Sequence, residues 1–215
     1  MSAEPYGLKY LKSVCVSGSA MINGICITEM VCPVPIAFDY KTDDEDINKI
    51  LRAAHETFIQ NSFDLFTDCP TRERAGWLCD SFFLGRAEKL YTGKNLIEKN
   101  FLENYLLLDN YENIPDGMIP MCYPADVDSG GFIPNWAMWF ILELRDYSYR
   151  TGDSAFISLF MDKVYRLIGW FESFENADGL LERLPGWVFI EWSKANDFVQ
   201  DINFPSNMLY SAALS

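Results

Sequence analysis

The chain has 215 residues, of which 49% are hydrophobic and 15% aromatic, so it can bury a sizeable core and is not a disordered chain. Its formal net charge of −14 excludes nucleic acids and anionic membranes as expected partners, because both attract positively charged surfaces. The sequence lacks the run of roughly 18 apolar residues that a membrane span needs, and its N-terminus lacks a signal-peptide pattern.

The six cysteines are scattered and form no Cys-x-x-Cys pair. This spacing indicates free thiols in a reducing compartment rather than a disulfide framework. We therefore expect a cytoplasmic location.

The first forty residues carry a β pattern. Residues 10–16 and 24–31 alternate or run in β-branched residues, and short turn sequences separate them. This predicts two or three strands, which are not stable as a sheet on their own. We interpret residues 1–40 as the tail of a β-sandwich-like domain, or as a strand patch packed on the rest of the chain.

From Thr42 onward the spacing of apolar residues becomes helical. Asp43 and Asp44 can cap the first helix, and Gly93 can end the second. A long connection over 109–132 is rich in Pro, Gly and Asp, and loops of this length are usually functional or disordered. The predicted helices cover about 43–58, 82–92, 95–108, 134–149, 154–175 and 205–215, with a short hairpin near 180–192.

One stretch, residues 67–80, has a composition that is unusual for a connection between helices. It holds three carboxylates, two arginines and a tryptophan. Pro70 disfavours helix at the residue before it, so the stretch should begin as a rigid loop. If the chain is helical from Arg72 onward, Glu73 and Asp80 are seven residues apart and lie on the same side.

These residue types suit carbohydrate chemistry. Arg72 could hold Asp68 or a sugar hydroxyl with its planar set of donors, and Trp77 offers a flat face for a pyranose ring. Carboxylates kept at different pKa values are what acid and base steps at a sugar need. The alternative is that this stretch is only a charged helix cap with surface salt bridges.

The order of Asp68, Cys69, Pro70, Arg72, Glu73, Arg74, Gly76, Trp77 and Asp80 resembles the hallmark motif of the α-L-rhamnosidases of glycoside hydrolase family seventy-eight. Weaker likenesses follow in the same order at 116–120, 123–126, 151–153, 178–180 and 207–210. The resemblance implies a mainly α fold. Residues 41–215, with about six helices, would be the N-terminal half of an (α/α) six-hairpin toroid, preceded by the short β-strand segment.

The resemblance also implies an inverting glycosidase that cleaves terminal α-L-rhamnosides. Glu73 would be the general acid, while the general base would lie in a part of the barrel that these residues do not contain. Turnover by this chain alone is therefore not expected. The expected substrate-binding residues are Asp68, Arg72, Trp77, Asp80, Asn135, Trp136, Trp187, Glu191 and Trp192.

Other functions leave weaker signals. His55 is the only histidine, which argues against a Ser-His-Asp triad or a histidine-rich zinc site. Asp126 and Asp128 lack the further ligands of a calcium loop, and no glycine-rich phosphate loop is present, so we expect neither metal nor cofactor. The expected partners are a rhamnose-containing oligosaccharide or glycoside, and a second copy through the open flank of the half barrel. The alternatives are a non-catalytic carbohydrate-binding remnant or another inverting glycosidase on the same toroid.

Overall fold

The computed structural model describes residues 7–37, 40–125, 131–194, 196 and 201–215, and within these ranges the chain is mainly helical. The prediction of a mainly α fold is confirmed. The helices are α1 (Glu45–Gln60), α2 (Asp80–Thr92), α3 (Leu96–Asn104), α4 (Pro134–Thr151), α5 (Ser154–Ser158), α6 (Met161–Glu172) and α7 (Phe204–Ala213).

The helix ends follow the capping signals of the sequence. The Asp44 carboxylate accepts hydrogen bonds from the backbone N–H groups of Asp46 and Ile47 at the start of α1. Gly93 and Gly152 end α2 and α4, each with φ near 70°, a conformation that glycine adopts without strain.

Two predicted helices were too long. The helix expected over 154–175 is divided into α5 and α6, and the one expected to reach residue 108 ends at Asn104. Side-chain periodicity continues across both breaks, so it could not locate them. The ends of helices are also the least certain part of such predictions.

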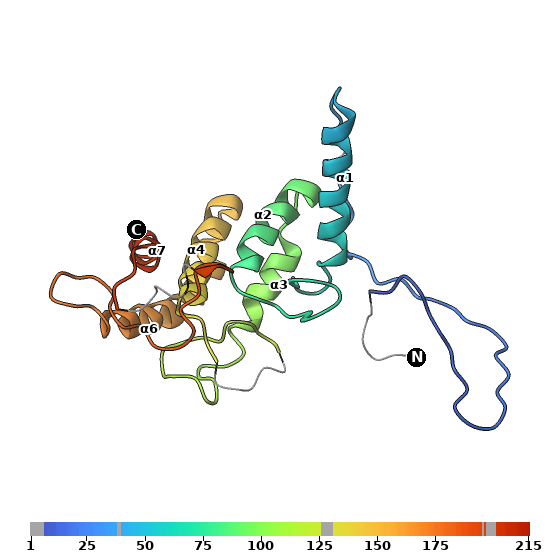
Figure 1. The fold of residues 1–215 in the computed structure, drawn as a ribbon. Coiled ribbons are helices and arrows are strands. Elements are labelled where there is room, and N and C mark those ends of the chain that lie inside the picture. The colour runs from blue at the N-terminus through green and yellow to red at the C-terminus, as the bar shows by residue number, and fades with distance from the viewer. Residues whose placement is uncertain (1–6, 38–39, 126–130, 195, 197–200) are drawn as a thin grey trace.

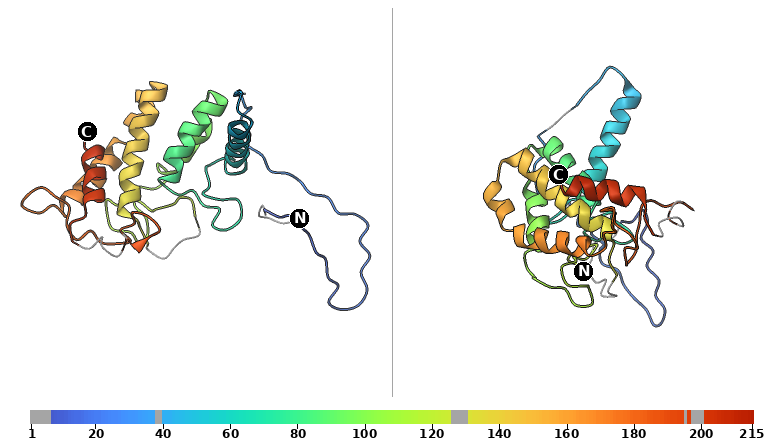
Figure 2. Two further views of the ribbon diagram at one scale, coloured as in Figure 1. Left: turned by 45° about the horizontal axis from the view of Figure 1, so that its top comes forward. Right: turned by 90° about the vertical axis from the view of Figure 1, so that its left-hand side faces the viewer.

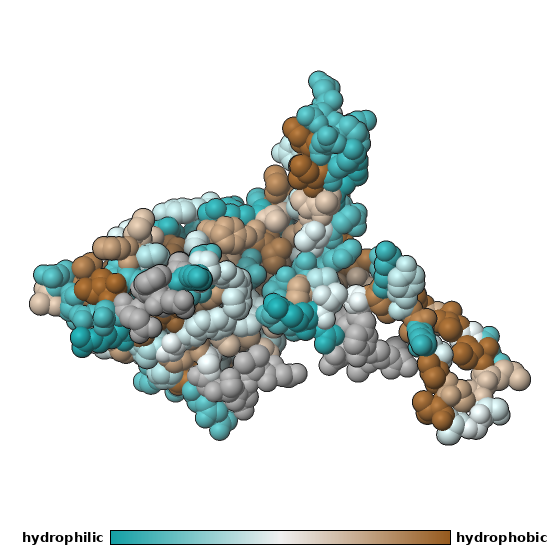
Figure 3. Space-filling model, viewed as in Figure 1, coloured by the Kyte–Doolittle hydropathy of each residue, from teal (hydrophilic) through white to brown (hydrophobic). Residues whose placement is uncertain are grey.

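The predicted β elements are absent from the described residues. Residues 7–31 form an extended arm that projects away from the helices and carries no strand, so the two strands predicted there are wrong for this chain (Figures 1 and 2). Its apolar side chains are exposed, and Figure 3 shows them as a brown band on the arm. Strands need partners, and the described chain offers this arm none.

The hairpin predicted near 180–192 is also wrong. Only one isolated bridge, between Glu175 and Leu181, is found in this region. Arg183 and Gly186 both have positive φ, which bends an extended run away from a regular ladder.

α4 is the central helix of the fold. It packs against α2 on one side and α7 on the other, and α1 packs against α2, so these four helices form a row (Figure 2). The buried ring of Phe140 on α4 contacts Tyr105 and Phe160, with ring centroids 5.2 and 6.0 Å apart. Aromatic packing around α4 thus makes most of the core.

A buried ionic network joins α2, α3 and α4. The carboxylate of Glu88 accepts the first N–H groups of α3, from Leu96, Ile97 and Glu98, at 2.7–2.9 Å. Arg150 of α4 donates to the fully buried carboxylate of Glu98 at 2.9 Å. Buried charges are stable only when they are paired in this way.

Gly85 of α2 makes room for this network, which yields a prediction. A Cβ at this position would lie 2.4 Å from Oε1 of Glu98, whose carboxylate is held by Arg150 and cannot move aside freely. Gly85→Ala should therefore lower the free energy of unfolding by about 1–3 kcal/mol. Urea unfolding followed by circular dichroism measures the change.

Gly169 in α6 provides the matched control. It also lies inside a helix, but no atom lies within 4 Å of an added Cβ. Gly169→Ala should be neutral or stabilise the chain by up to about 1 kcal/mol, because alanine favours helix. Equal effects of the two substitutions would contradict the packing argument.

Candidate functional site

The stretch 67–80 forms a closed loop that leads into α2. The backbone N–H of Asp68 donates to the carbonyl of Ala75 at 3.2 Å, and the N–H of Ala75 donates to the Asp68 carboxylate at 3.1 Å. Arg74 lies in the left-handed region with φ 53°. The condition that the chain is helical from Arg72 onward is therefore not met, and α2 begins only at Asp80.

Residues 76–78 pair with residues 121–123 of the long connection. The N–H of Leu78 donates to the carbonyl of Met121 at 2.9 Å, and the N–H of Tyr123 donates to the carbonyl of Gly76 at 3.3 Å. A Cβ at Gly76 would lie 3.0 Å from the ring of Phe101, so this close approach favours glycine. The pairing ties the motif to the 109–132 connection.

The three carboxyls of the motif lie near one another although they do not share a helix. Burial raises the pKa of Asp80 to about 6, with further contributions from the charges of Asp68 and Glu73. Burial and the same two carboxylates raise the pKa of the Cys122 thiol to about 11. Asp80 and Cys122 therefore both lie in the field of Asp68 and Glu73.

Glu73 and Arg72 lie on the outer side of the loop. The Glu73 side chain is 35% exposed and forms an ion pair with Arg72, whose side chain is 77% exposed. Arg72 thus pairs with its neighbour and not with Asp68, which differs from the prediction. The reason is the bond between Asp68 and Ala75, which occupies the Asp68 carboxylate inside the loop.

The predicted tryptophans converge on one aromatic residue that the sequence did not single out, Phe189. Trp136 contacts Phe189 with ring centroids 5.0 Å apart, and Trp187 and Trp192 contact it at 5.2 and 5.0 Å. Trp77 packs against the same small cluster, which also contains Met121, Cys122 and Ile133. The aromatic run 187–192 was the signal that could have identified Phe189.

Trp77 and Trp136 share a further property. Within the part of the chain that the structure describes, the indole N–H groups of both are buried and have no hydrogen-bond partner. Buried donors of this kind normally find an acceptor. Two buried indole donors without a described acceptor therefore lie on the aromatic side of the motif.

Asn135 and Glu191 have different positions. Asn135 is buried, and its amide donates to the Ser206 hydroxyl at 2.7 Å, so it joins α4 to α7. Glu191 is exposed, accepts a hydrogen bond from Ser193, and is not among the groups that raise the pKa of Asp80. The structure does not bring Glu191 into the carboxyl cluster.

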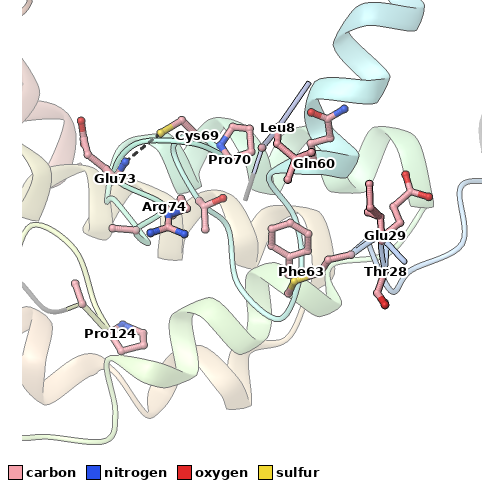
Figure 4. A pocket seen from close by; sticks show the side chains of 16 residues that line it. Leu8, Thr28, Glu29, Gln60, Phe63, Cys69, Pro70, Glu73, Arg74 and Pro124 are labelled. Carbon is pink, nitrogen blue, oxygen red and sulfur yellow. Dashed lines mark hydrogen bonds between the residues drawn. The ribbon is translucent and has the colours of Figure 1, made fainter. Parts of the chain in front are cut away.

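A cavity of about 1000 Å³ lies between the motif and the N-terminal arm (Figure 4). The motif contributes Cys69, Pro70, Glu73 and Arg74 to its wall, and the arm contributes residues 7–8 and 27–30. In Figure 4 the Glu73 carboxylate lies at the rim of the cavity and points away from its centre, while its backbone N–H donates to the Sγ of Cys69 at 3.4 Å.

No group of three potential metal ligands occurs among the described residues, and Asp126 and Asp128 lie outside them. Nor does any helix in the described ranges have the length and hydrophobicity needed to cross a membrane.

Comparison with known proteins places these features in a family. Residues 37–213 match the model of the bacterial α-L-rhamnosidase six-hairpin glycosidase domain. The chain belongs to this family. The resemblance of the motif is thereby confirmed, and so is the partial six-hairpin architecture.

Three solved rhamnosidases have similar folds. The chain is similar to a family seventy-eight rhamnosidase of Bacillus sp. GL1, with a TM-score of 0.72 and 23% identity over 85% of this chain and 18% of that one. It is also similar to a Klebsiella oxytoca rhamnosidase with rhamnose bound, with a TM-score of 0.60 and 22% identity over 75% of this chain and 31% of that one.

An α-L-rhamnosidase of Dictyoglumus thermophilum gives a TM-score of 0.60 with 17% identity, over 80% of this chain and 19% of that one. The chain thus spans less than a third of the length of each of these three rhamnosidases. The search of curated protein sequences found no match.

The raised pKa of Asp80 in this six-hairpin domain predicts a dependence of stability on pH. An unfolded aspartate has a pKa near 3.8, and the folded value is about 6. The folded state therefore binds the proton more tightly, and this contribution to stability is complete below pH ~4 and lost as the pH rises through ~6. The difference corresponds to about 2–3 kcal/mol.

Asp80→Asn should remove this contribution, so the variant should lose less stability between pH 4 and 7 than the wild type. Asp68→Asn keeps the acceptor for the Ala75 N–H but removes one neighbouring charge, and should have a smaller effect in the same direction. Urea unfolding at a series of pH values measures both. If the stability of Asp80→Asn depended on pH as that of the wild type does, the raised pKa of Asp80 would not be the cause of this dependence.

Proposed function

We propose that this chain is part of the catalytic domain of an inverting glycosidase that cleaves terminal α-L-rhamnosides, with Glu73 as the general acid. The proximity of Asp68, Glu73 and Asp80 in a loop next to the Trp77 and Trp136 side chains is the main support. Family membership adds to it.

Inversion uses two carboxyl groups on opposite faces of the sugar, roughly 6.5–9.5 Å apart. One donates a proton to the leaving oxygen, and the other activates a water molecule. Glu73 lies at the rim of the loop, where a glycosidic oxygen can reach it, and it is less buried than Asp80. The general base is expected in a region of the barrel beyond these 215 residues.

The remaining residues would bind the sugar ring. Asp68 and Asp80 can accept hydrogen bonds from hydroxyls, and Trp77 and Trp136 provide apolar walls together with two buried N–H donors. The Klebsiella oxytoca relative was solved with rhamnose bound, which supports rhamnose as the ligand to test. Arg72, Trp187, Glu191 and Trp192 remain candidates for contacts at the outer rim.

A non-catalytic carbohydrate-binding role is the second candidate. The observation that favours it is the orientation of Glu73, whose carboxylate points away from the centre of the cavity (Figure 4). A binding role needs only the sugar-contacting residues, while turnover also needs the base. Another inverting glycosidase on the same toroid would use the same two carboxyl roles with a different sugar.

We also propose that the domain associates with a second copy through the open flank of the half barrel. On α7, Phe204 and Met208 are exposed, as are the apolar residues of the arm, and exposed apolar patches of this kind mark interaction surfaces. A cytoplasmic location remains a proposal based on the six free cysteines.

Ligand preference is the direct test of the sugar site. We expect L-rhamnose to change the tryptophan fluorescence of the chain and to give a binding isotherm by calorimetry, with a weaker response or none to D-glucose. Asp80→Asn should weaken rhamnose binding about tenfold or more, equivalent to about 1.4 kcal/mol, because it removes a charged acceptor. Asp162→Asn, an exposed change on α6, is the control.

Equal responses to both sugars, or none to either, would contradict the assignment of rhamnose. A response that survives Asp80→Asn unchanged would move the site away from the motif.

The role of Glu73 is tested in a complete enzyme that contains this domain. Loss of a general acid lowers the rate by about 10²–10⁴ when the leaving group is poor. An aryl rhamnoside with an acidic phenol needs little protonation, so Glu73→Gln should reduce its hydrolysis much less. Steady-state rates on an alkyl and an aryl rhamnoside give the comparison, and equal losses on both would leave Glu73 with a binding role only.

A further inference from the structure

Glu143 is a buried carboxyl that the sequence did not point to and that the proposed reaction does not use. It lies inside α4, and its side chain is completely buried. Its Oε2 accepts a hydrogen bond from the hydroxyl of Ser81 at 2.6 Å. Its Oε1 is buried and has no partner among the described residues.

Glu143 is not part of the ion pairs beside it. Arg150 follows Glu143 by seven residues on α4, and it donates hydrogen bonds to Glu98 and Asp146, each at 2.9 Å. Burial and the nearby charge of Glu98 hold the pKa of Glu143 well above its usual range. The charge of Arg150 acts in the opposite direction, but burial is the largest effect, so the raised pKa favours the protonated form of Glu143.

Ser81 connects Glu143 to the motif. It directly follows Asp80 at the start of α2, and its backbone N–H donates to the carbonyl of Trp77 at 3.2 Å. Cys79, which lies between Trp77 and Asp80, has a backbone φ of 76°, which residues other than glycine rarely adopt. The hydrogen bond from Ser81 to Glu143 therefore anchors a tight turn that carries both Trp77 and Asp80.

We propose that Glu143 is a positioning residue for the substrate site: its buried carboxyl group holds the Ser81 hydroxyl and so fixes the turn from Trp77 to Asp80. The importance of this for sugar binding rests on the proposed function, but the anchoring itself does not.

The charged and titratable groups around the two carboxyls are few. Among the described residues, Glu143 is faced by Glu98 of α3, by Asp146 and Arg150 of its own helix, by the thiol of Cys79 and by the phenol of Tyr105. Asp80 is faced by Asp68 and Glu73. The titration of Asp80 therefore reports on the turn, since its burial is the largest cause of its raised pKa.

The experiment follows the carboxyl signal of Asp80 by NMR during a pH titration of the 215-residue chain, for the wild type and three variants. Glu143→Gln keeps the shape of the side chain and the oxygen that accepts from Ser81, so the Asp80 midpoint should stay near 6. Glu143→Ala and Ser81→Ala break the anchor, let water reach Asp80, and should lower the midpoint by about one pH unit or more.

Glu88→Gln is the matched control, because Glu88 is also a buried carboxyl and lies on α2. It caps α3 at the opposite end of α2 from Asp80, so it should reduce stability without moving the Asp80 midpoint. Glu88→Gln thus separates a general loss of stability from a change in the turn.

An unchanged midpoint in Ser81→Ala and Glu143→Ala would overturn the proposal, and so would a Glu143→Gln variant that shifts as far as Glu143→Ala. If Glu143→Ala does not fold, Ser81→Ala and Glu143→Gln still decide the point. Rhamnose titrations of the same variants are read separately. An absence of rhamnose binding in the wild type would count against the proposed function, while the NMR result would still test the anchor.

Discussion

The pairing of Arg150 with Glu98 is the constraint on which the arrangement of the central helices depends. Glu98 is completely buried in α3, and a buried carboxylate without a partner is strongly destabilising. Arg150 can reach it only if the end of α4 lies near the start of α3, and Gly85 must leave the space open on α2. One ion pair thus fixes three helices relative to one another, and with them the start of α2, where the motif ends.

The motif combines residues that build the loop with residues that are free for chemistry. Asp68 and Gly76 are occupied by the fold, the first through its two bonds to Ala75 and the second through its close approach to Phe101. Glu73 makes little structural contact beyond its ion pair with the exposed Arg72, which is worth little to stability. The spacing of the motif is irregular because some of its residues must close the loop while others must keep their side chains available for chemistry.

The sequence predicted the helices well where local signals decide them. The Asp44 cap and Gly93 are local signals, and α1 begins and α2 ends where these residues predicted, while α4 runs past its predicted end at 149 to Thr151. It failed for the arm, because whether 10–16 forms a strand depends on a partner strand elsewhere. The sequence also indicated that Glu73 and Asp80 lie on the same side if the chain is helical from Arg72 onward, but the structure has a loop there. The positive φ of Arg74 and the bond from Ala75 to Asp68 have no signature in apolar periodicity. Glu143 was missed for the same reason, since only the fold brings it to the motif, whereas Phe189 lies in the aromatic run 187–192 and could have been identified from it.

The site also shows why stability and chemistry oppose each other in this loop. Asp80 lies in a buried position beside two other carboxyls, which raises its pKa and costs folding free energy near neutral pH. A structure selected for stability alone would separate these groups or supply a cation, as Arg150 does for Glu98. Among the described residues, the ion pair formed by the motif carboxyls is the one between Glu73 and the exposed Arg72. Asp80 follows directly after Cys79, whose positive φ makes a tight turn before α2, and the buried hydrogen bond between Ser81 and Glu143 holds that turn.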